Sequence, residues 1–274
     1  MFPKIISFKT PDFLSSFLPD HLSLNSYGFF IGLGIMAAYF IILYKTKHLG
    51  LTKDRLSELF LWGFLAAFVG GKLLFYLEDP TKYINNPILM LKNIGNGFVF
   101  YGSLLLVVPT IYFWLRYYKI SFWPFMDGVA FGGPVLHSLG RVGCFLAGCC
   151  HGKICPDGIK NIVGVTFTDP SSAANITNIP IYPTQLFDIA INMLTLLVVY
   201  LVSKKQQFEG QLFLIYITLY GIGRVINENF RGDEDRGYLL GGMVTYSQFI
   251  AFVLILLSSI AWYFLQKKSK STHA

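Results

Sequence analysis

The chain has 274 residues, of which 54% are hydrophobic and 14% charged, with a net charge of +7 and a mean hydropathy of +0.53. A soluble globular domain carries nearly twice that share of charged residues, so the composition excludes an ordinary soluble protein and indicates a polytopic membrane protein. Cytoplasmic loops of membrane proteins gather Lys and Arg, so we interpret the positive charge as a topological signal and expect no nucleic-acid partner.

Residues 1–25 contain the amphipathic stretch DFLSSFLPDHLSL, which we expect to lie along the membrane interface and not to act as a cleavable signal peptide. A spanning helix needs about 20 mostly apolar residues. Seven segments meet this requirement: 26–44, 57–77, 98–116, 124–147, 183–202, 210–229 and 244–265. The sequence therefore predicts an all-α integral membrane domain over residues 1–274.

The charges between these segments alternate. The loops after the first, third, fifth and seventh segments are rich in Lys and Arg, whereas the other loops hold acidic residues that offset their cations. The positive-inside rule then places the N-terminus outside and the C-terminus in the cytoplasm. The loop 148–182 and the acidic turn 231–240 are expected on the outer face. The alternating VGVTFT in that loop predicts a short strand or hairpin.

We expect two charged residues in or beside the segments to have structural roles. Lys72 is near enough to a helix end for its ammonium group to snorkel to the interface. Asp127 lies in the first part of the fourth segment, where its charge would stabilise the start of that helix.

For Arg141, in contrast, we expect a functional role. On a helix, His137, Arg141 and Cys144 are spaced i, i+4 and i+7 and share one face. Ionisable groups at membrane depth are costly and usually face a cavity, a substrate or a partner. The alternative is structural: Arg141 pairs with Asp127 or Asp188 and only holds helices together.

Arg224 repeats the pattern in the sixth segment. Tyr220, Arg224, Glu228 and Arg231 follow at spacings of four, four and three, which places them on one helical face. Part of this face could be an ordinary salt-bridged helix end. Two arginines in glycine-bearing helices, however, suit the recognition of a phosphate group.

The four cysteines, Cys144, Cys149, Cys150 and Cys155, fall within one short stretch. Their spacing lacks the paired C-x2-C of structural zinc sites, so the sequence favours a disulfide or simple packing over a metal site. The disulfide would be a pair such as Cys149–Cys155 on an oxidising outer face. The packing role would use only the small size of the side chains.

Several separated motifs carry a family resemblance that extends over most of the chain. They are NSYGFFIGLG (25–34), FYGSLL (100–105), HSLGRVGCFLAGCCHG (137–152), IYPTQLFD (181–188) and YGIGRVINENFRGDED (220–235). Together they resemble the prolipoprotein diacylglyceryl transferases, in the branch whose signature contains cysteines.

The sequence departs from the better-known branch at informative positions. Tyr101 stands where that branch has a histidine proposed as the base, Cys144 replaces an asparagine, and Cys149 replaces a glutamate. Further departures are Ser103 for a glycine, Tyr182 for a histidine and Asp188 for a glutamate. The resemblance carries over the frame of the site but not the identity of its base.

The resemblance implies an enzyme of the bacterial inner membrane that transfers diacylglyceryl from phosphatidylglycerol to the lipobox cysteine of a prolipoprotein. It implies neither a metal nor a soluble cofactor. The attacking thiol must lose its proton, and His137 and Tyr101 are both candidate bases. His137 could equally be a packing residue. The candidate catalytic residues are His137, Tyr101, Arg141, Arg224 and Glu228, and the candidate substrate-binding residues are Arg141, Arg224, Arg231, Tyr27, Gln185, Asn227, Gly102 and Gly152.

Three other functions fit parts of the pattern. A channel or transporter could line its pore with Arg141 and Arg224, although the chain shows no internal repeat. A thiol-redox membrane protein would use the cysteine cluster, and a related lipid transferase would use the same donor with another acceptor.

Overall fold

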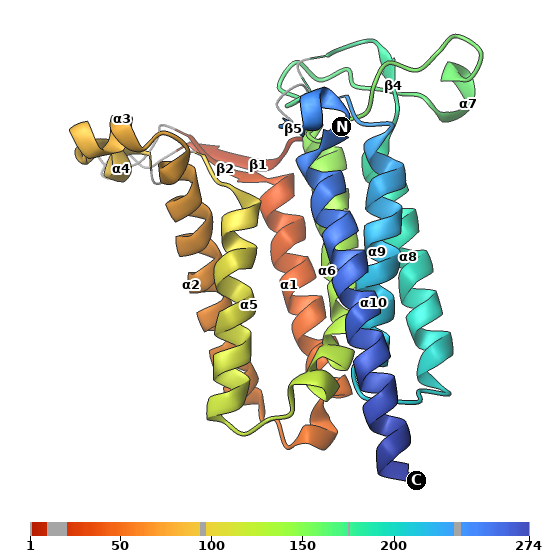
Figure 1. The fold of residues 1–274 in the computed structure, drawn as a ribbon. Coiled ribbons are helices and arrows are strands. Elements are labelled where there is room, and N and C mark those ends of the chain that lie inside the picture. The colour runs from red at the N-terminus through yellow and green to blue at the C-terminus, as the bar shows by residue number, and fades with distance from the viewer. Residues whose placement is uncertain (1, 10–20, 94–96, 175, 233–236, 274) are drawn as a thin grey trace. The chain divides into compact units, whose positions relative to one another are not determined.

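The computed structural model describes residues 2–9, 21–93, 97–174, 176–232 and 237–273, and it is mostly helical. The chain forms two compact units. Unit 1 comprises residues 1–42 and 126–274, and unit 2 comprises residues 43–125. Figure 1 shows the helices of each unit, which are described separately below.

Every predicted spanning segment is helical in the structure. In the described ranges, the seven long helices are α1 (Ser26–Lys45), α2 (Lys53–Glu78), α5 (Phe100–Tyr117), α6 (Phe122–Ala147), α8 (Thr184–Ser203), α9 (Gln211–Glu228) and α10 (Tyr246–His273). Within the described residues, five of them are long and apolar enough to cross a membrane, namely α1, α2, α6, α8 and α10. A membrane-spanning protein is therefore confirmed, and the count of seven spans stays a prediction.

Unit 2 is built on the contact between α2 and α5. A Cβ atom on Gly102 would overlap the carbonyl oxygen of Gly70, so the two backbones touch where neither residue has a side chain. Beside this contact, the Ser103 hydroxyl of α5 donates a hydrogen bond to the Ala67 carbonyl of α2 at 2.7 Å. The unit is completed by η1 (Lys47–Leu49), α3 (Pro80–Asn85) and α4 (Ile88–Lys92).

Lys72 does not snorkel to the interface. Its residue is only 6% exposed, and its ammonium nitrogen donates to the carbonyls of Asn93 at 2.8 Å and Gly97 at 2.7 Å. Asn93 follows α4 and Gly97 precedes α5, so the lysine ties these two positions to α2. The structural role of Lys72 is confirmed. Its charge is accommodated by burial and hydrogen bonding, and not by reaching the interface.

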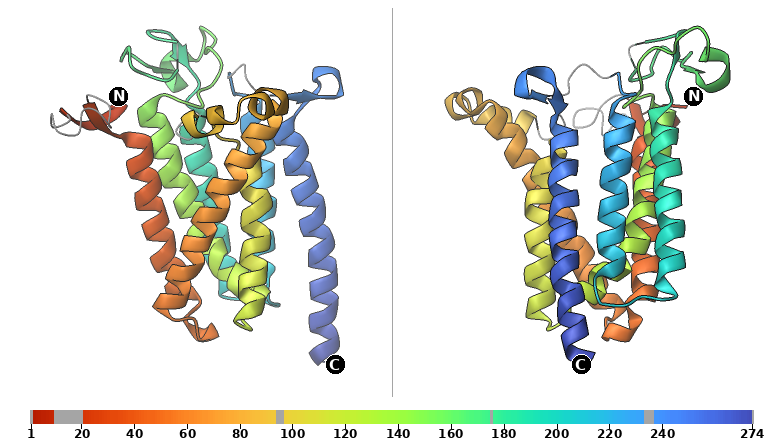
Figure 2. Two further views of the ribbon diagram at one scale, coloured as in Figure 1. Left: turned by 90° about the vertical axis from the view of Figure 1, so that its left-hand side faces the viewer. Right: turned by 45° about the vertical axis from the view of Figure 1, so that its right-hand side comes forward.

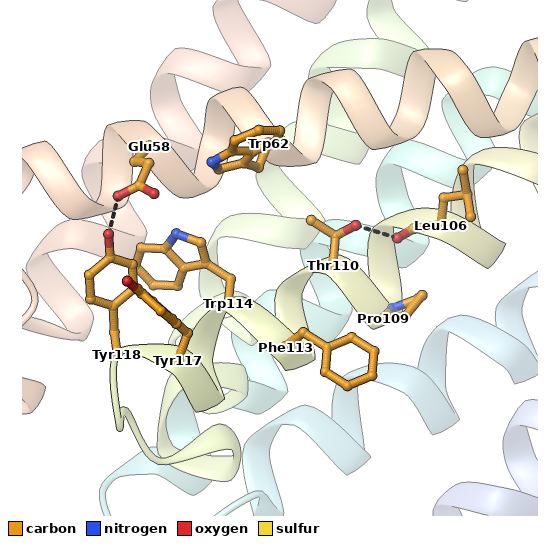
Figure 3. Close-up of a pocket in the computed structure, with 9 residues that line it drawn as sticks. All are labelled: Glu58, Trp62, Leu106, Pro109, Thr110, Phe113, Trp114, Tyr117 and Tyr118. Atoms are coloured by element: carbon orange, nitrogen blue, oxygen red, sulfur yellow. Dashed lines mark hydrogen bonds between the residues drawn. The ribbon is translucent and has the colours of Figure 1, made fainter.

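A pocket of 410 Å³ lies along the seam between α2 and α5 (Figure 3). Aromatic rings form most of its wall, and the Tyr118 hydroxyl donates to the Glu58 carboxylate at 2.7 Å. Its lining residues are Glu58, Trp62, Leu106, Pro109, Thr110, Phe113, Trp114, Tyr117 and Tyr118. None of the predicted site residues lines this pocket, and its one charged side chain is an acid, so it is poorly suited to a phosphate.

Unit 1 packs its helices through small residues. A Cβ atom on Gly143 of α6 would lie 3.0 Å from the Cα atom of Tyr27 in α1, and one on Gly133 would lie 3.0 Å from the Tyr216 hydroxyl in α9. Helices α8 and α9 lie side by side (Figure 2), and α10 packs against α9. Close helix approach at glycine is typical of membrane bundles.

Asp127 stabilises a helix start, but not that of its own helix. Its carboxylate accepts the backbone N–H groups of Gly210 at 2.7 Å and Phe213 at 3.0 Å, and the Gln206 side-chain amide at 2.6 Å. These donors lie at or just before the N-terminus of α9, where the helix leaves its N–H groups unpaired. The prediction that Asp127 stabilises the start of α6 is therefore wrong. Asp127 caps α9 through a tertiary contact.

The short elements of unit 1 lie at one end of its helices (Figure 1). The predicted strand in VGVTFT is found as β3 (Val165–Thr166), which pairs antiparallel with β4 (Pro180–Ile181) beside α7 (Lys160–Val163). Two further hairpins pair β1 (Lys4–Lys9) with β2 (His21–Asn25), and β5 (Tyr238–Leu239) with β6 (Val244–Thr245) around η2 (Leu240–Gly242). Most of the predicted interfacial stretch and the acidic residues 233–235 lie outside the described residues.

Candidate functional site

Arg141 lies in the last two turns of α6 and makes two polar contacts. Its Nε atom is 2.8 Å from Oδ2 of Asp188 in α8 and also donates to Nε2 of His137 at 3.3 Å. The side chains of the ion pair are 14% and 5% exposed, so both charges are largely withdrawn from solvent. Pairing with Asp188, one of the two acids proposed as structural partners, is confirmed.

The Asp188 carboxylate links three helices. While Oδ2 faces Arg141 of α6, Oδ1 accepts the side-chain amide of Asn227 in α9 at 2.6 Å. The same amide donates to the Thr184 carbonyl at 3.0 Å, at the start of α8. This network fixes the direction in which the guanidinium group of Arg141 points.

Arg224 has a similar arrangement on α9. Its Nη2 atom is 2.7 Å from Oε2 of Glu228 and donates to the Ser247 hydroxyl of α10 at 3.0 Å. The predicted i, i+4 pair is thus confirmed. The Nη1 atom of Arg224 is buried without a hydrogen-bond partner among the described residues. A buried guanidinium donor in this condition is costly and suits an anionic ligand.

Arg231 lies beyond the end of α9, so it does not continue the helical face as predicted. It is only 6% exposed, and its backbone forms an isolated antiparallel bridge with Gly152 of the loop after α6. A Cβ atom on Gly152 would overlap the carbonyl oxygen of Tyr182, which requires glycine there. Next to it, the buried His151 ring places Nδ1 3.0 Å from the Gly152 carbonyl. Gly152 thus joins the loop to the segment after α9.

The start of α8 holds the cysteine-bearing turn after α6. The Gln185 side chain donates to the Cys149 carbonyl at 2.7 Å, and the Thr184 hydroxyl donates to the Cys150 carbonyl at 2.8 Å. Both side chains are buried. The amide oxygens of Gln185 and Asn227 are buried without a donor among the described residues, so both can accept a hydrogen bond.

The cysteines are free thiols, and three of them meet. The Sγ atoms of Cys144, Cys149 and Cys150 lie within 4.8 Å of one another. Cys155 lies elsewhere, and its backbone N–H donates to the Pro180 carbonyl at 2.9 Å. The pairing Cys149–Cys155 considered from the sequence is therefore not formed. The spacing could not show this cluster, because it depends on the turn that follows α6.

The remaining predicted site residues are divided between the units. Tyr27, 47% exposed, lies in the first turn of α1 beside Gly143 of α6. Tyr101 and Gly102 belong to unit 2, at the start of α5. Unit 1 thus brings His137 and Arg141 together with Asp188 and Asn227, while the roles of Tyr27, Tyr101 and Gly102 stay predictions.

The chain is similar to known proteins over most of its length. The family model described as "Prolipoprotein diacylglyceryl transferase" matches residues 16–264. A relative from Clostridium tetani named phosphatidylglycerol–prolipoprotein diacylglyceryl transferase is 34% identical, over 86% of this chain and 91% of its own length. A relative from Clostridium perfringens with the same name and the number 2 is 31% identical, over 90% and 92%. One from Acinetobacter baumannii is 28% identical, over 90% of each chain.

The family model covers nearly the whole chain, including all the helices that carry the arginine, histidine and cysteine residues described above. Two relatives above 30% identity extend over most of both sequences. This chain belongs to the prolipoprotein diacylglyceryl transferase family.

Proposed function

We propose that this protein transfers the diacylglyceryl group of phosphatidylglycerol to the lipobox cysteine thiol of prolipoproteins. The products are a thioether and glycerol phosphate. The names of the relatives support this activity, and the family assignment favours a transferase over a channel.

The observation that carries the proposal is the buried Nη1 donor of Arg224, which has no partner in the part of the chain that the structure describes. Arg141 and Arg224 are each held by one carboxylate, from Asp188 and Glu228. Arg231, which is only 6% exposed, is proposed as a third guanidinium group that contacts the phosphate. When the glycerol C–O bond breaks, a second negative charge develops on the phosphate. Fixed guanidinium groups stabilise it without having to reorganise.

The amide groups of the site fit the head group. The buried oxygens of Gln185 and Asn227 can accept hydrogen bonds from glycerol hydroxyls. Tyr27, Gly102 and Gly152 complete the proposed contact set.

The base that removes the thiol proton is proposed as His137 or Tyr101. The Nε2 atom of His137 already accepts a hydrogen bond from Arg141, so His137 would act as a base through its Nδ1 atom.

The location proposed is the bacterial inner membrane, with seven spans, the N-terminus outside and the C-terminus in the cytoplasm. In support, the N- and C-terminal parts of unit 1 lie at its opposite ends (Figure 1). Reporter fusions after residues 204 and 270 should both report the cytoplasm. A periplasmic signal from either one contradicts the seven-span arrangement.

Complementation tests the activity. The protein is expressed in bacteria depleted of their own transferase, and a reporter lipoprotein is analysed by mass spectrometry. We expect the mass gain of one diacylglyceryl group on the lipobox cysteine. Correct membrane insertion without this gain contradicts the proposal, and modification of another acceptor would indicate the related lipid transferase.

A further inference from the structure

We propose that Cys144, Cys149 and Cys150 bind a zinc ion whose fourth position takes the acceptor thiol of the prolipoprotein. This inference rests on the proposed transferase function and assigns the step that deprotonates the thiol. It starts from three sulfur atoms within 4.8 Å of one another in the turn that follows α6.

The distances fit a shared ion. With Zn–S bonds of about 2.3 Å, three sulfurs in a tetrahedral arrangement lie about 3.8 Å apart. The observed separations need to contract by no more than about 1 Å, which side-chain rotation of three cysteines can supply. The missing C-x2-C spacing argues against a closed structural site, but catalytic zinc sites use three protein ligands and leave one position open.

The turn that carries two of the ligands is held in place. The carbonyls of Cys149 and Cys150 accept hydrogen bonds from the buried side chains of Gln185 and Thr184. Cys150 has a positive φ of 59°, which is uncommon for a residue with a side chain, and Gly148 has a φ of 80°. This backbone turns the third thiol toward the other two. A ligand set held by a second layer of hydrogen bonds is typical of metal centres.

A zinc ion at this position would help the acceptor thiol to lose its proton. The acceptor thiol is a weak nucleophile until it loses its proton, and a thiol bound to zinc is deprotonated outright. The zinc-bound thiolate attacks the glycerol carbon of the lipid. The S–C bond forms, the C–O bond to phosphate breaks, and the electron pair of that bond leaves with glycerol phosphate. The thiol proton passes to the base proposed above, His137 or Tyr101, and the neutral thioether, a weak ligand, leaves the zinc.

The position of the cluster agrees with this step. Cys144 follows Arg141 by three residues in α6, so the thiol and the phosphate-binding guanidinium share a helical face.

Metal content is the first test. The protein is purified in reducing detergent buffer through an affinity tag that binds no metal, and its metals are measured by mass spectrometry. We expect about one zinc per chain, as a single three-cysteine site requires. Cys144→Ser, Cys149→Ser and Cys150→Ser should each lose the zinc. Cys155→Ser, which changes a cysteine outside the cluster, should keep it.

Cobalt substitution tests the open position without relying on activity. Cobalt-loaded wild-type protein should show thiolate-to-metal charge-transfer absorption. This absorption should increase when a lipobox peptide is added, and it should not change with the same peptide carrying serine in place of cysteine. An identical response to both peptides overturns the proposed substrate position.

Three results overturn the zinc proposal. They are wild-type protein that contains no zinc although all its thiols are reduced, a disulfide within the cluster of the active enzyme, and zinc-free enzyme that transfers diacylglyceryl at the full rate. The last result leaves the transferase function standing. Zinc-loaded wild type that binds the peptide but transfers nothing contradicts the transferase function instead.

Discussion

Asp188→Asn tests whether the network around Arg141 holds the helices of unit 1 together. The substitution keeps the shape of the side chain and an oxygen that can still accept the Asn227 amide. It removes the negative charge that lies 2.8 Å from Arg141 and leaves that guanidinium buried without its counter-charge.

The cost follows from burial. Removing one partner of a buried ion pair costs about 3–5 kcal/mol, and with side-chain exposures of 14% and 5% this pair falls in that class. We therefore expect Asp188→Asn to destabilise the protein by about 4 kcal/mol. For a chain of this size that corresponds to a melting temperature lower by roughly 8 °C or more.

The assay is thermal unfolding of the purified protein in detergent, followed by the loss of helical circular dichroism. Asp157→Asn is the matched control, because Asp157 pairs with Lys160 at the same 2.8 Å distance but its side chain is 94% exposed. An exposed pair contributes little, so this variant should melt with the wild type.

A double-mutant cycle completes the test. In an Arg141→Gln background the cation that faces Asp188 is gone, so Asp188→Asn should cost less than about 1.5 kcal/mol there, the value of an ordinary hydrogen bond. An equal cost in both backgrounds, or a cost in the wild type no larger than that of Asp157→Asn, would refute the reasoning. Arg141 would then be neutralised by something other than Asp188.

The other predictions concern the phosphate and the helix contact of unit 2. Arg141→Lys and Arg224→Lys should each lower transfer by roughly 10–100-fold in the lipoprotein mass assay, because a charged hydrogen bond worth about 1.5–3 kcal/mol is lost. The exposed Arg116→Lys should match the wild type, and equal transfer by all three variants would exclude phosphate recognition. Gly102→Ala should destabilise the protein by about 1–3 kcal/mol in the melting assay, because its Cβ would overlap a carbonyl of α2. Gly63→Ala, where a Cβ meets nothing within 4 Å, should not; equal melting of the two variants contradicts the close contact.

The sequence by itself determined the helices and the local pairs. Apolar segments of spanning length predicted the positions of the seven long helices, because in a membrane the backbone must satisfy its hydrogen bonds within each segment. The contact of His137 with Arg141 and the pair of Arg224 with Glu228 could also be predicted from the sequence. Both are i, i+4 neighbours, and helical periodicity alone brings them together.

Only the tertiary structure decided which distant groups meet. Asp188 was one of two acids that could pair with Arg141, and the choice depends on how α6 and α8 are rotated toward each other. Asp127 caps a helix that begins more than 80 residues later, as shown by its bond to the N–H of Gly210. The three-sulfur cluster depends on a left-handed turn at Cys150. Periodicity describes one helix at a time, whereas these contacts are set by the packing of one helix or turn against another, and no local pattern encodes that packing.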